Sequence, residues 1–395
     1  MRWRRPDGLL VLEPSVGTEL ARLNFLEGLA RAVMTGVVPL AAYEALGSKQ
    51  AVSYVFIGGA VITVLFTLNV GALERRLHRR WVVTMAAAFL VVAAVLLAFA
   101  DGPLFALAIG LRSAEASIFS VCLSLYIMDY IGKRDLTVTE SRRIVYTGAA
   151  WLVGPTLGVW LWSSASKTAP FGVSAVITLV MIGYFWRLRF HRHPVLLTPN
   201  SAIPNPFVNI VRYFGQRHLR IAYVITLSRA VFWAALFVYG PIYIVEAGMP
   251  TWTAGVFLSV ASAMLFTSPL IRRAADRFGS RSVIIASFVL MAVGMLALAL
   301  LPEPQPLGVA FWLVGSVGGA ALDVLGNIPF MRTVKPRERT AMTTVFSTWR
   351  EVSFLVAPVI AAVALAAGSF RILYVVLALL LAAAAVATSY LPKRI

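Results

Sequence analysis

Runs of about twenty apolar residues recur along the whole length of this 395-residue chain. A helix of about 20 residues can cross the hydrocarbon core of a bilayer, and only helices and closed barrels do so with every backbone group paired. The composition agrees, because 13% of the residues are charged, against about 25% in soluble domains. The chain is therefore predicted to be an all-α polytopic membrane protein.

The apolar runs predict twelve transmembrane helices. They lie near residues 20–43, 51–72, 81–100, 104–128, 144–164, 171–187, 220–245, 252–271, 282–301, 307–330, 341–367 and 371–391. The long connection after the sixth helix divides them into two groups of six. We expect an N-terminal six-helix half at 1–190, a linker at 191–219 and a C-terminal six-helix half at 220–395.

The connections alternate in charge. The N-terminus, the segments 74–80, 132–143, 187–220, 272–281 and 331–339, and the C-terminus are rich in arginine, whereas the connections between them are short and nearly neutral. Basic loops stay in the cytoplasm during insertion. We therefore expect both termini on the cytoplasmic side of the inner (plasma) membrane. The net charge of +18 belongs to these loops and does not indicate nucleic-acid binding.

The residues that usually carry enzyme or metal chemistry are sparse. Cys122 is the single cysteine and lies inside an apolar run, and the four histidines fall in basic loops. No metal-ligand cluster, disulfide framework, nucleophile–base pair or phosphate loop follows from this inventory. The N-terminus lacks the pattern of a removable signal peptide. We expect no cofactor, no metal and no enzymatic activity.

The linker contains one helical pattern. Asn205-Pro206 is typical of a helix start, and apolar residues follow at helical spacing up to Phe214. We expect a short helix that either lies on the cytoplasmic lipid surface or covers the end of the bundle.

The two halves repeat short sequences at equivalent places. Arg31-Ala32-Val33 in the first span matches Arg229-Ala230-Val231 in the seventh, and 152–155 (LVGP) in the fifth matches 355–358 (LVAP) in the eleventh. A duplicated six-helix unit, giving two pseudo-symmetric bundles, accounts for both matches.

The first span carries two charges near its middle. A charge at membrane depth costs about 2.5–3.5 kcal/mol on insertion scales and persists where it faces the bundle interior or a watery cavity. Glu27 and Arg31 are four residues apart and share a helix face, the spacing of an ion pair. A salt bridge that only packs helices is the alternative to a functional pair.

With these features the chain resembles the major facilitator superfamily (MFS) over essentially its full length. The superfamily has a loop motif, GxxxDRxGRR, after the second helix of each half. The second half is similar at Asp276, Arg277, Gly279 and Arg281, with Arg272 in place of the first glycine. The first half resembles the motif less closely, at Gly71, Arg76, Arg79 and Arg80, with its acid displaced to Glu74 and His78 replacing the second glycine. The resemblance implies a charge network that holds the halves in one state.

The fifth span contains Gly154-Pro155-Thr156-Leu157-Gly158, which resembles the glycine–proline motif of the superfamily's proton-coupled drug and metabolite antiporters. Small residues allow close helix packing and proline bends a helix. The resemblance is partial, since Ala150 and Val159 stand where glycine is usual. It favours export, although glycine and proline are common in membrane helices.

Further charges lie within the apolar spans: Arg112 and Glu115 in the fourth, Arg229 in the seventh, Asp323 in the tenth, and Arg350 and Glu351 in the eleventh. In the superfamily the first, fourth, seventh and tenth helices line the central path. The resemblance therefore implies that Arg31, Arg112, Arg229 and Asp323 face that path. Arginines and acids nearly balance, so the interior is not built for substrates of one sign.

Each charge has an expected role. Arg112 resembles the fourth-helix arginine linked to proton coupling in antiporters, and Glu115, three residues on, shares its face and is a candidate proton carrier, as are Glu27 and Asp323. Arg31 and Arg229 are candidates to hold a carboxylate or phosphate. Arg350 and Glu351 point about 100° apart, so at most one faces the path.

Aromatic residues in the seventh and eleventh spans either line the central transport path or contact lipid. They are Trp233, Tyr239, Tyr243, Phe346 and Trp349.

We thus expect a monomeric, proton-coupled secondary transporter that moves a small organic solute by alternating access, with efflux favoured. The alternatives are uptake or exchange of an organic anion, and a non-transporting membrane scaffold or receptor on the same fold. The sequence does not identify the solute.

Overall fold

The computed structural model describes residues 15–99, 103–130, 136–188, 206–334, 338–366 and 370–392. The first half of the chain forms α1 (Ser15–Thr35), α2 (Val37–Leu46), α3 (Lys49–Arg76), α4 (Arg79–Phe99), α5 (Pro103–Tyr130), α6 (Leu136–Ser164) and α7 (Ala169–Arg187). The short helix α8 (Pro206–Gly215) follows. Its position confirms the helix predicted in the linker.

The second half contains the long helices α9 (Arg217–Glu246), α12 (Ser280–Leu300), α13 (Pro306–Leu325), α16 (Trp349–Ala366) and α17 (Phe370–Ser389). The remaining spans are built from shorter pieces. α10 (Trp252–Ala263), the 3-10 helix η2 (Met264–Thr267) and α11 (Ser268–Phe278) follow one another, α14 (Ile328–Thr333) extends α13, and α15 (Arg339–Ser347) precedes α16.

Eleven helices or helix series among the described residues are long and apolar enough to cross a membrane. The twelfth span is α6, whose 29 residues correspond to the predicted fifth helix. It packs along α1 and against α10, which places it inside the protein. The chain is thus an all-helical, multi-pass membrane protein with two six-helix bundles.

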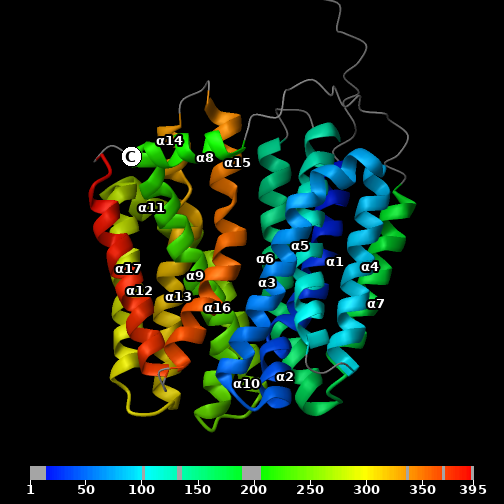
Figure 1. Cartoon of the computed structure of the whole chain (residues 1–395), viewed down its shortest axis with the longest axis horizontal. Helices are drawn as coiled ribbons and strands as arrows, with labels where there is room; N and C mark the ends of the chain where they lie inside the picture. Colours follow the sequence, from blue (N-terminus) through cyan, green and yellow to red (C-terminus); the bar gives the residue numbers. More distant parts are fainter. Residues whose placement is uncertain are drawn as a thin grey trace, which may run out of the picture.

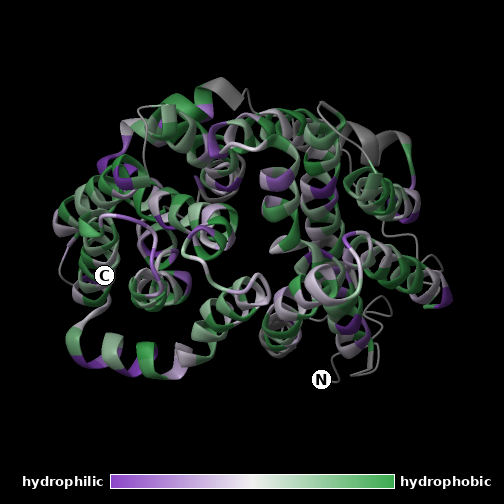
Figure 2. Ribbon diagram, turned by 90° about the horizontal axis from the view of Figure 1, so that it is seen from below, coloured by the Kyte–Doolittle hydropathy of each residue, from purple (hydrophilic) through white to green (hydrophobic). Residues whose placement is uncertain are grey.

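The two bundles lie side by side with their helices running in the same general direction (Figure 1). One contains α1–α7 and the other α9–α17. Figure 2 views the helices end on, and hydrophobic residues make up much of most of them. The packing is mainly within halves, as in α1 with α6 and α12 with α17, while α6 with α10 and α3 with α16 join the halves.

The first span is broken between α1 and α2. Pro39 cannot donate a backbone hydrogen bond to the carbonyl of Thr35, four residues earlier, so a regular helix is interrupted there. Gly36 lies at the break, where a Cβ would stand 2.8 Å from Val159 and 3.1 Å from Leu258. The break therefore lies where α6 of the first half and α10 of the second half both pack against the first span.

The glycine–proline segment of α6 is packed directly against the backbone of α1. A Cβ on Gly158 would stand 1.8 Å from the carbonyl oxygen of Val33, and one on Gly154 would stand 2.4 Å from the Cβ of Ala32. On the other side, Gly255 of α10 approaches the carbonyl of Pro155. Close approach of three helices is what glycine permits in membranes. The segment therefore holds α1 immediately beside Arg31.

Helix α8 is docked on the second half. The side chain of Tyr213 is fully buried and donates a hydrogen bond to the carbonyl of Leu219 at 3.0 Å. Arg212 forms an ion pair with Glu338 at 2.5 Å. Burial raises the pKa of Tyr213, so its phenol stays neutral. Val208 and Val211 remain exposed, so the helix both covers the bundle end and presents an apolar face outward.

We expect Gly158→Ala to destabilise the protein by about 1–3 kcal/mol, because the new methyl group overlaps the backbone of α1 and cannot be accommodated by a side-chain rotation. The matched control is Gly172→Ala in α7, where a Cβ meets nothing within 4 Å. Thermal unfolding of both variants in detergent measures the difference. Equal midpoints for the two variants would contradict the packing described here.

Candidate functional site

The first half holds a group of charges near the middle of its helices. Arg31 Nε and Glu27 Oε1, both on α1, lie 2.7 Å apart. Arg112 of α5 donates hydrogen bonds to the carbonyl of Arg31 at 3.0 Å and to the hydroxyl of Thr35 at 2.6 Å. The expected Glu27–Arg31 pair therefore forms, and Arg112 is attached to the same turn of α1.

Glu115 lies one turn from Arg112 on α5 and is completely buried. Neither carboxyl oxygen has a hydrogen-bond partner in the described part of the chain. The charges of Glu27, Arg31 and Arg112 all act on it. Glu115 is thus a buried acid beside two arginines that are bonded to other groups.

The second half holds a pair that joins two helices. Arg229 Nη1 of α9 lies 3.1 Å from Asp323 Oδ1 of α13 and also donates to the carbonyl of Leu322 at 3.1 Å. The guanidinium of Arg229 stands over the ring of Trp349, 5.1 Å from its centre. Arg229 is nearly buried, whereas the side chain of Asp323 is 29% exposed.

Three aromatic rings lie between the two charged groups. The guanidinium of Arg31 is 5.9 Å from the ring centre of Trp151 on α6. Trp151 contacts Phe237 of α9 with ring centres 5.4 Å apart, and Phe237 stacks on Trp233 at 5.7 Å. All three rings are partly exposed. We call Trp151, Phe237 and Trp233 the aromatic strip; it crosses from one half of the protein to the other.

The aromatic strip therefore lies between a charged group on the first half, at Arg31, and a charged group on the second half, at Asp323 and Arg229. No ion pair within the described segments joins the first-half charges to Arg229 and Asp323, so each half balances its own charges. Arg31 and Asp323 are both partly exposed, at 23% and 29% of their side chains. Because the strip joins α6 to α9, we interpret this exposure as facing the space between the halves and not lipid. Such a surface can stack a planar group and pair with a charge at either end.

The halves are joined at the end of the bundle opposite α8. Tyr43 donates a hydrogen bond to Glu246 at 2.9 Å, and Lys49 forms an ion pair with Glu246 at 2.7 Å. One turn deeper, the hydroxyls of Ser53 and Tyr239 lie 2.6 Å apart. We call these five residues the interhalf cluster, since Tyr43, Lys49 and Ser53 belong to the first half and the others to the second.

A second contact between the halves lies deeper, at the glycine–proline segment. The hydroxyl of Thr156 on α6 hydrogen-bonds to that of Ser259 on α10 at 2.8 Å, and the backbone N–H of Thr156 donates to the same oxygen at 3.2 Å. Together with the interhalf cluster it joins the two halves toward the end of the protein that carries α2.

The loop-motif residues of the second half lie at the α8 end. Asp276 is 76% exposed and lies 4.0 Å from Arg272 of its own helix. Arg277 stands over Phe278, and Arg281 donates to the carbonyl of Ser389. Gly279 has a φ of +84°, which favours glycine. These contacts are all within the second half.

In the first half, Arg79 stands over the ring of Tyr126 and Arg80 over that of Trp186, again within one half. Gly71 and Arg76 lie in α3; the surroundings of Gly71 and the side chain of Arg76 are outside the described part of the chain.

In the eleventh span, Arg350 is exposed and stands over the ring of Trp349 at 5.6 Å. Glu351 lies in α16, and its side chain is outside the described part.

Several of these residues were not predicted from the sequence. Among the expected aromatic residues Trp233 and Trp349 lie beside the charges, Tyr239 is buried in the interhalf cluster, and Tyr243 and Phe346 are buried in helix packing. Trp151 and Phe237 were not predicted. The sequence places Glu246 and Lys49 in predicted connections that are nearly neutral overall, whereas in the structure they end α9 and begin α3. Their opposite charges in facing connections, Lys49 before the second span and Glu246 after the seventh, are the signal that would have indicated a contact.

Comparison with known proteins decides the family. A family model described as Major Facilitator Superfamily matches residues 20–268 and 261–394. The chain belongs to the Major Facilitator Superfamily. It is therefore a membrane transporter and not an enzyme. No curated protein matches the sequence.

Solved structures of other superfamily-fold transporters resemble the whole chain. The crystal structure of the nucleoside transporter NupG is 14% identical, covers 95% of this chain and 100% of its own, and has a TM-score of 0.76. A POT family transporter in complex with 5-aminolevulinic acid is 12% identical, covers 96% of both chains, and has a TM-score of 0.75. At these identities the likeness establishes the fold alone.

We expect Glu246→Gln to loosen the end that carries α2, because it removes the ion pair with Lys49 and weakens the hydrogen bond from Tyr43. A hydrogen bond to a charged group contributes about 1.5–3 kcal/mol. A cysteine placed at Ala42, which is fully buried on α2, reports the change through its rate of reaction with a thiol reagent in a Cys122→Ser background.

The labelling rate is expected to rise several-fold in Glu246→Gln. The control is Glu303→Gln, which changes an exposed acid at the same end of the bundle and leaves the cluster intact. Identical rates for the two variants would mean that the interhalf cluster does not hold this end closed.

Proposed function

We propose that the protein is a proton-coupled secondary transporter that moves a small amphipathic organic solute across the inner membrane. The observation that carries the proposal is Glu115, a fully buried acid without a hydrogen-bond partner in the described chain, beside Glu27, Arg31 and Arg112. A static packing group would be expected to have its lone pairs satisfied, because an unpaired polar group is costly to bury. An acid that must gain and lose a proton cannot be permanently paired.

The arginine-rich connections orient the protein in this proposal. Their described parts lie at the end that carries α8, and the positive-inside rule then assigns this end and both termini to the cytoplasm. The interhalf cluster then closes the opposite, non-cytoplasmic end. Alternating access requires the two six-helix halves, 1–190 and 220–395, to rock about the centre so that this closure breaks as the cytoplasmic end closes.

Arg112 supplies the coupling step. In the present state its guanidinium is bonded to the carbonyl of Arg31 and the hydroxyl of Thr35 on α1. If the rocking motion shifts α1 against α5, these bonds break and the guanidinium becomes available to Glu115 on its own helix. Pairing then favours the carboxylate and releases a proton. Solute movement and proton release are linked because both depend on the same displacement.

The aromatic strip is the proposed binding surface for the solute. Trp151 and Phe237 come from different halves, so a solute stacked on them contacts both and senses their relative position. Arg31 lies at one end, and Asp323 with Arg229 at the other. A planar solute can stack on the rings while its polar or charged substituent pairs with a charged residue at either end of the strip. The balance of charges places no restriction on the sign of that substituent.

Export is favoured over uptake by the glycine–proline segment, which resembles that of antiporters. Uptake or exchange of an organic anion is the second candidate. It is less favoured because Arg31 and Arg229 are already paired with Glu27 and Asp323, and an anion must displace a carboxylate to reach either arginine. A non-transporting scaffold is disfavoured by the family itself.

We expect Glu115→Gln to abolish flux driven by a pH gradient while leaving solute exchange at equal pH, since glutamine cannot release a proton. A solute is first identified by thermal shift with nucleosides, dipeptides and planar aromatic acids and cations, because a ligand stabilises the folded state by mass action. Flux is then measured in proteoliposomes with the gradient imposed in either direction.

Glu303→Gln serves as the control and is expected to transport like the unmodified protein. Efflux that accelerates when the opposite compartment is acid supports antiport, whereas acceleration by protons on the solute's own side would contradict it. Undiminished gradient-driven flux in Glu115→Gln would refute the coupling role.

We expect Trp151→Ala to raise the half-saturating solute concentration about tenfold or more, because loss of a stacking ring removes about 1–3 kcal/mol, taken from base–aromatic contacts. Trp160→Ala is matched to it, since Trp160 lies on the same helix but is 52% exposed and outside the strip. Initial transport rates over a range of solute concentrations measure both. Equal effects of the two substitutions would remove the strip from the binding surface.

A further inference from the structure

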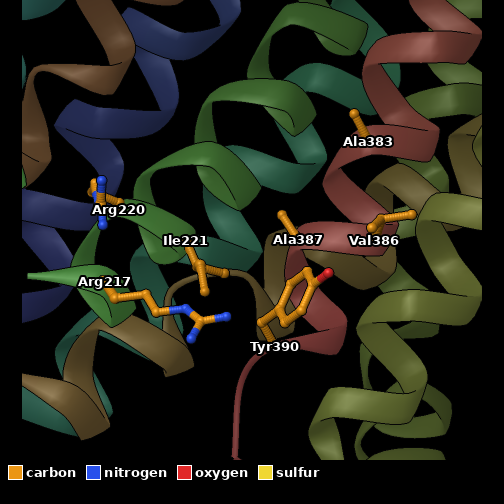
Figure 3. Close-up of a pocket in the computed structure, with 7 residues that line it drawn as sticks. All are labelled: Arg217, Arg220, Ile221, Ala383, Val386, Ala387 and Tyr390. Atoms are coloured by element: carbon orange, nitrogen blue, oxygen red, sulfur yellow. The ribbon is translucent and has the colours of Figure 1, made fainter.

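The second half carries a groove on its outer side, between the start of α9 and the end of α17. Its volume is about 450 Å³, and it is lined by Arg217, Arg220, Ile221, Ala383, Val386, Ala387 and Tyr390. Figure 3 shows Arg217 extended from α9 toward the ring of Tyr390 on α17, with Ile221 and Ala387 between the two helices. The groove lies at the end of the bundle that carries α8.

Two cations stand at the rim of this groove without an acid to balance them. Arg217 and Arg220 are both exposed, and no carboxylate of the described residues pairs with either. The guanidinium of Arg217 lies 5.0 Å from the ring centre of Tyr390, which fixes its position over the groove. Figure 3 shows Arg217 pointing toward Tyr390 and Arg220 on the other side of α9, so Arg217 is placed to hold a phosphate group through charge-assisted hydrogen bonds, and Arg220 adds positive charge at the same rim.

The rest of the groove is apolar. Ala383, Ala387 and Ile221 present small or branched hydrocarbon side chains, and Val386 is exposed beside them. Successive turns of α17 carry Ala387 and Ala383 away from the arginines, toward the middle of the membrane. The surface therefore offers a place for a hydrocarbon chain that continues from a phosphate-binding rim.

This groove is separate from the candidate transport site. Arg229 follows Arg220 by nine residues on α9, which places the two about 14 Å apart along the helix at 1.5 Å per residue. A soluble substrate has no reason to bind on the outer face of a bundle next to lipid. An amphipathic anion that is already dissolved in the membrane does, and its charge complements the two unpaired arginines.

We propose that this groove binds one anionic phospholipid, with its phosphate on Arg217 beside Tyr390, Arg220 adding positive charge at the rim, and an acyl chain along Ile221, Ala387 and Ala383. The phosphate supplies the missing negative charge, and the acyl chain covers the apolar floor. Anionic lipids are attracted to basic residues at the membrane surface in general. The groove adds selectivity for a single molecule, since headgroup and chain bind on one continuous surface.

The test is lipid binding to the purified full chain in detergent, followed by native mass spectrometry. Phosphatidylglycerol, phosphatidylcholine with the same acyl chains, and glycerol 3-phosphate are the three probes. One molecule of phosphatidylglycerol is expected to bind at least tenfold more tightly than phosphatidylcholine. Equal affinity for the two lipids would overturn the proposal, and so would binding of glycerol 3-phosphate as tight as that of phosphatidylglycerol.

Two pairs of variants separate the groove from general surface charge. Arg217→Gln/Arg220→Gln is expected to weaken the binding at least tenfold, whereas Arg272→Gln/Arg273→Gln removes two exposed charges at the same end and is expected to change it less than twofold. Equal losses in the two double variants would overturn the proposal.

Ala383→Leu keeps every charge but fills the groove, and it is also expected to weaken binding at least fivefold. Its control is Ala382→Leu, the neighbouring exposed alanine outside the groove. An unchanged affinity in Ala383→Leu, measured on protein with a normal thermal unfolding midpoint, would show that no acyl chain lies there and would overturn the proposal.

Discussion

The free energy needed to bury an ionised side chain inside a membrane constrains the centre of this structure. At mid-depth an ionised side chain needs a partner, and most of the charges that the spans carry have found one: Glu27 with Arg31, Arg229 with Asp323, and Arg112 with a carbonyl and a hydroxyl of α1. Glu115 differs, since it is buried without a hydrogen bond in the described residues. The proposal that Glu115 exchanges a proton rests on this difference.

The close contact of α6 with α1 makes this arrangement possible. Because Gly154 and Gly158 bring α6 onto the backbone of Ala32 and Val33, the turn that bears Arg31 is held from one side while Arg112 holds it from the other. The same stretch of α6 touches α10 of the second half through Thr156 and Ser259. A motion of one half relative to the other therefore acts directly on the helix that carries the central charges. The aromatic strip spans the same boundary, so a solute stacked on it, as proposed, would contact both halves.

Much of the fold follows from the sequence, because length and hydropathy decide a membrane helix locally. The spans, the short helix at 206–215 and the Glu27–Arg31 pair, which lies within one helix, were all predictable. Partners on different helices were not. Arg31 and Arg229 occupy equivalent places in the repeat, yet one pairs with an acid on its own helix and the other with an acid on α13.

The same limit applies to the aromatic strip and the interhalf cluster. The spacing of Trp151 along α6 does not distinguish a ring at the interface between halves from one that faces lipid, as Trp160 on the same helix illustrates. Glu246 is a single charge in a short connection, and its role depends on Tyr43 and Lys49, some two hundred residues away in the chain. Contacts between halves arise from tertiary packing that periodicity does not encode.

In the proposed mechanism the two halves rock about the polar centre, so that one end closes as the other opens. Distances between paired spin labels report this motion, with one pair at His78 and Arg277 near α8 and another at Ser166 and Glu303 at the opposite end. When the pH is changed or a solute that binds is added, we expect one distance to lengthen in the same fraction of molecules in which the other shortens. Distances that stay fixed at both ends, or that lengthen together, would contradict it.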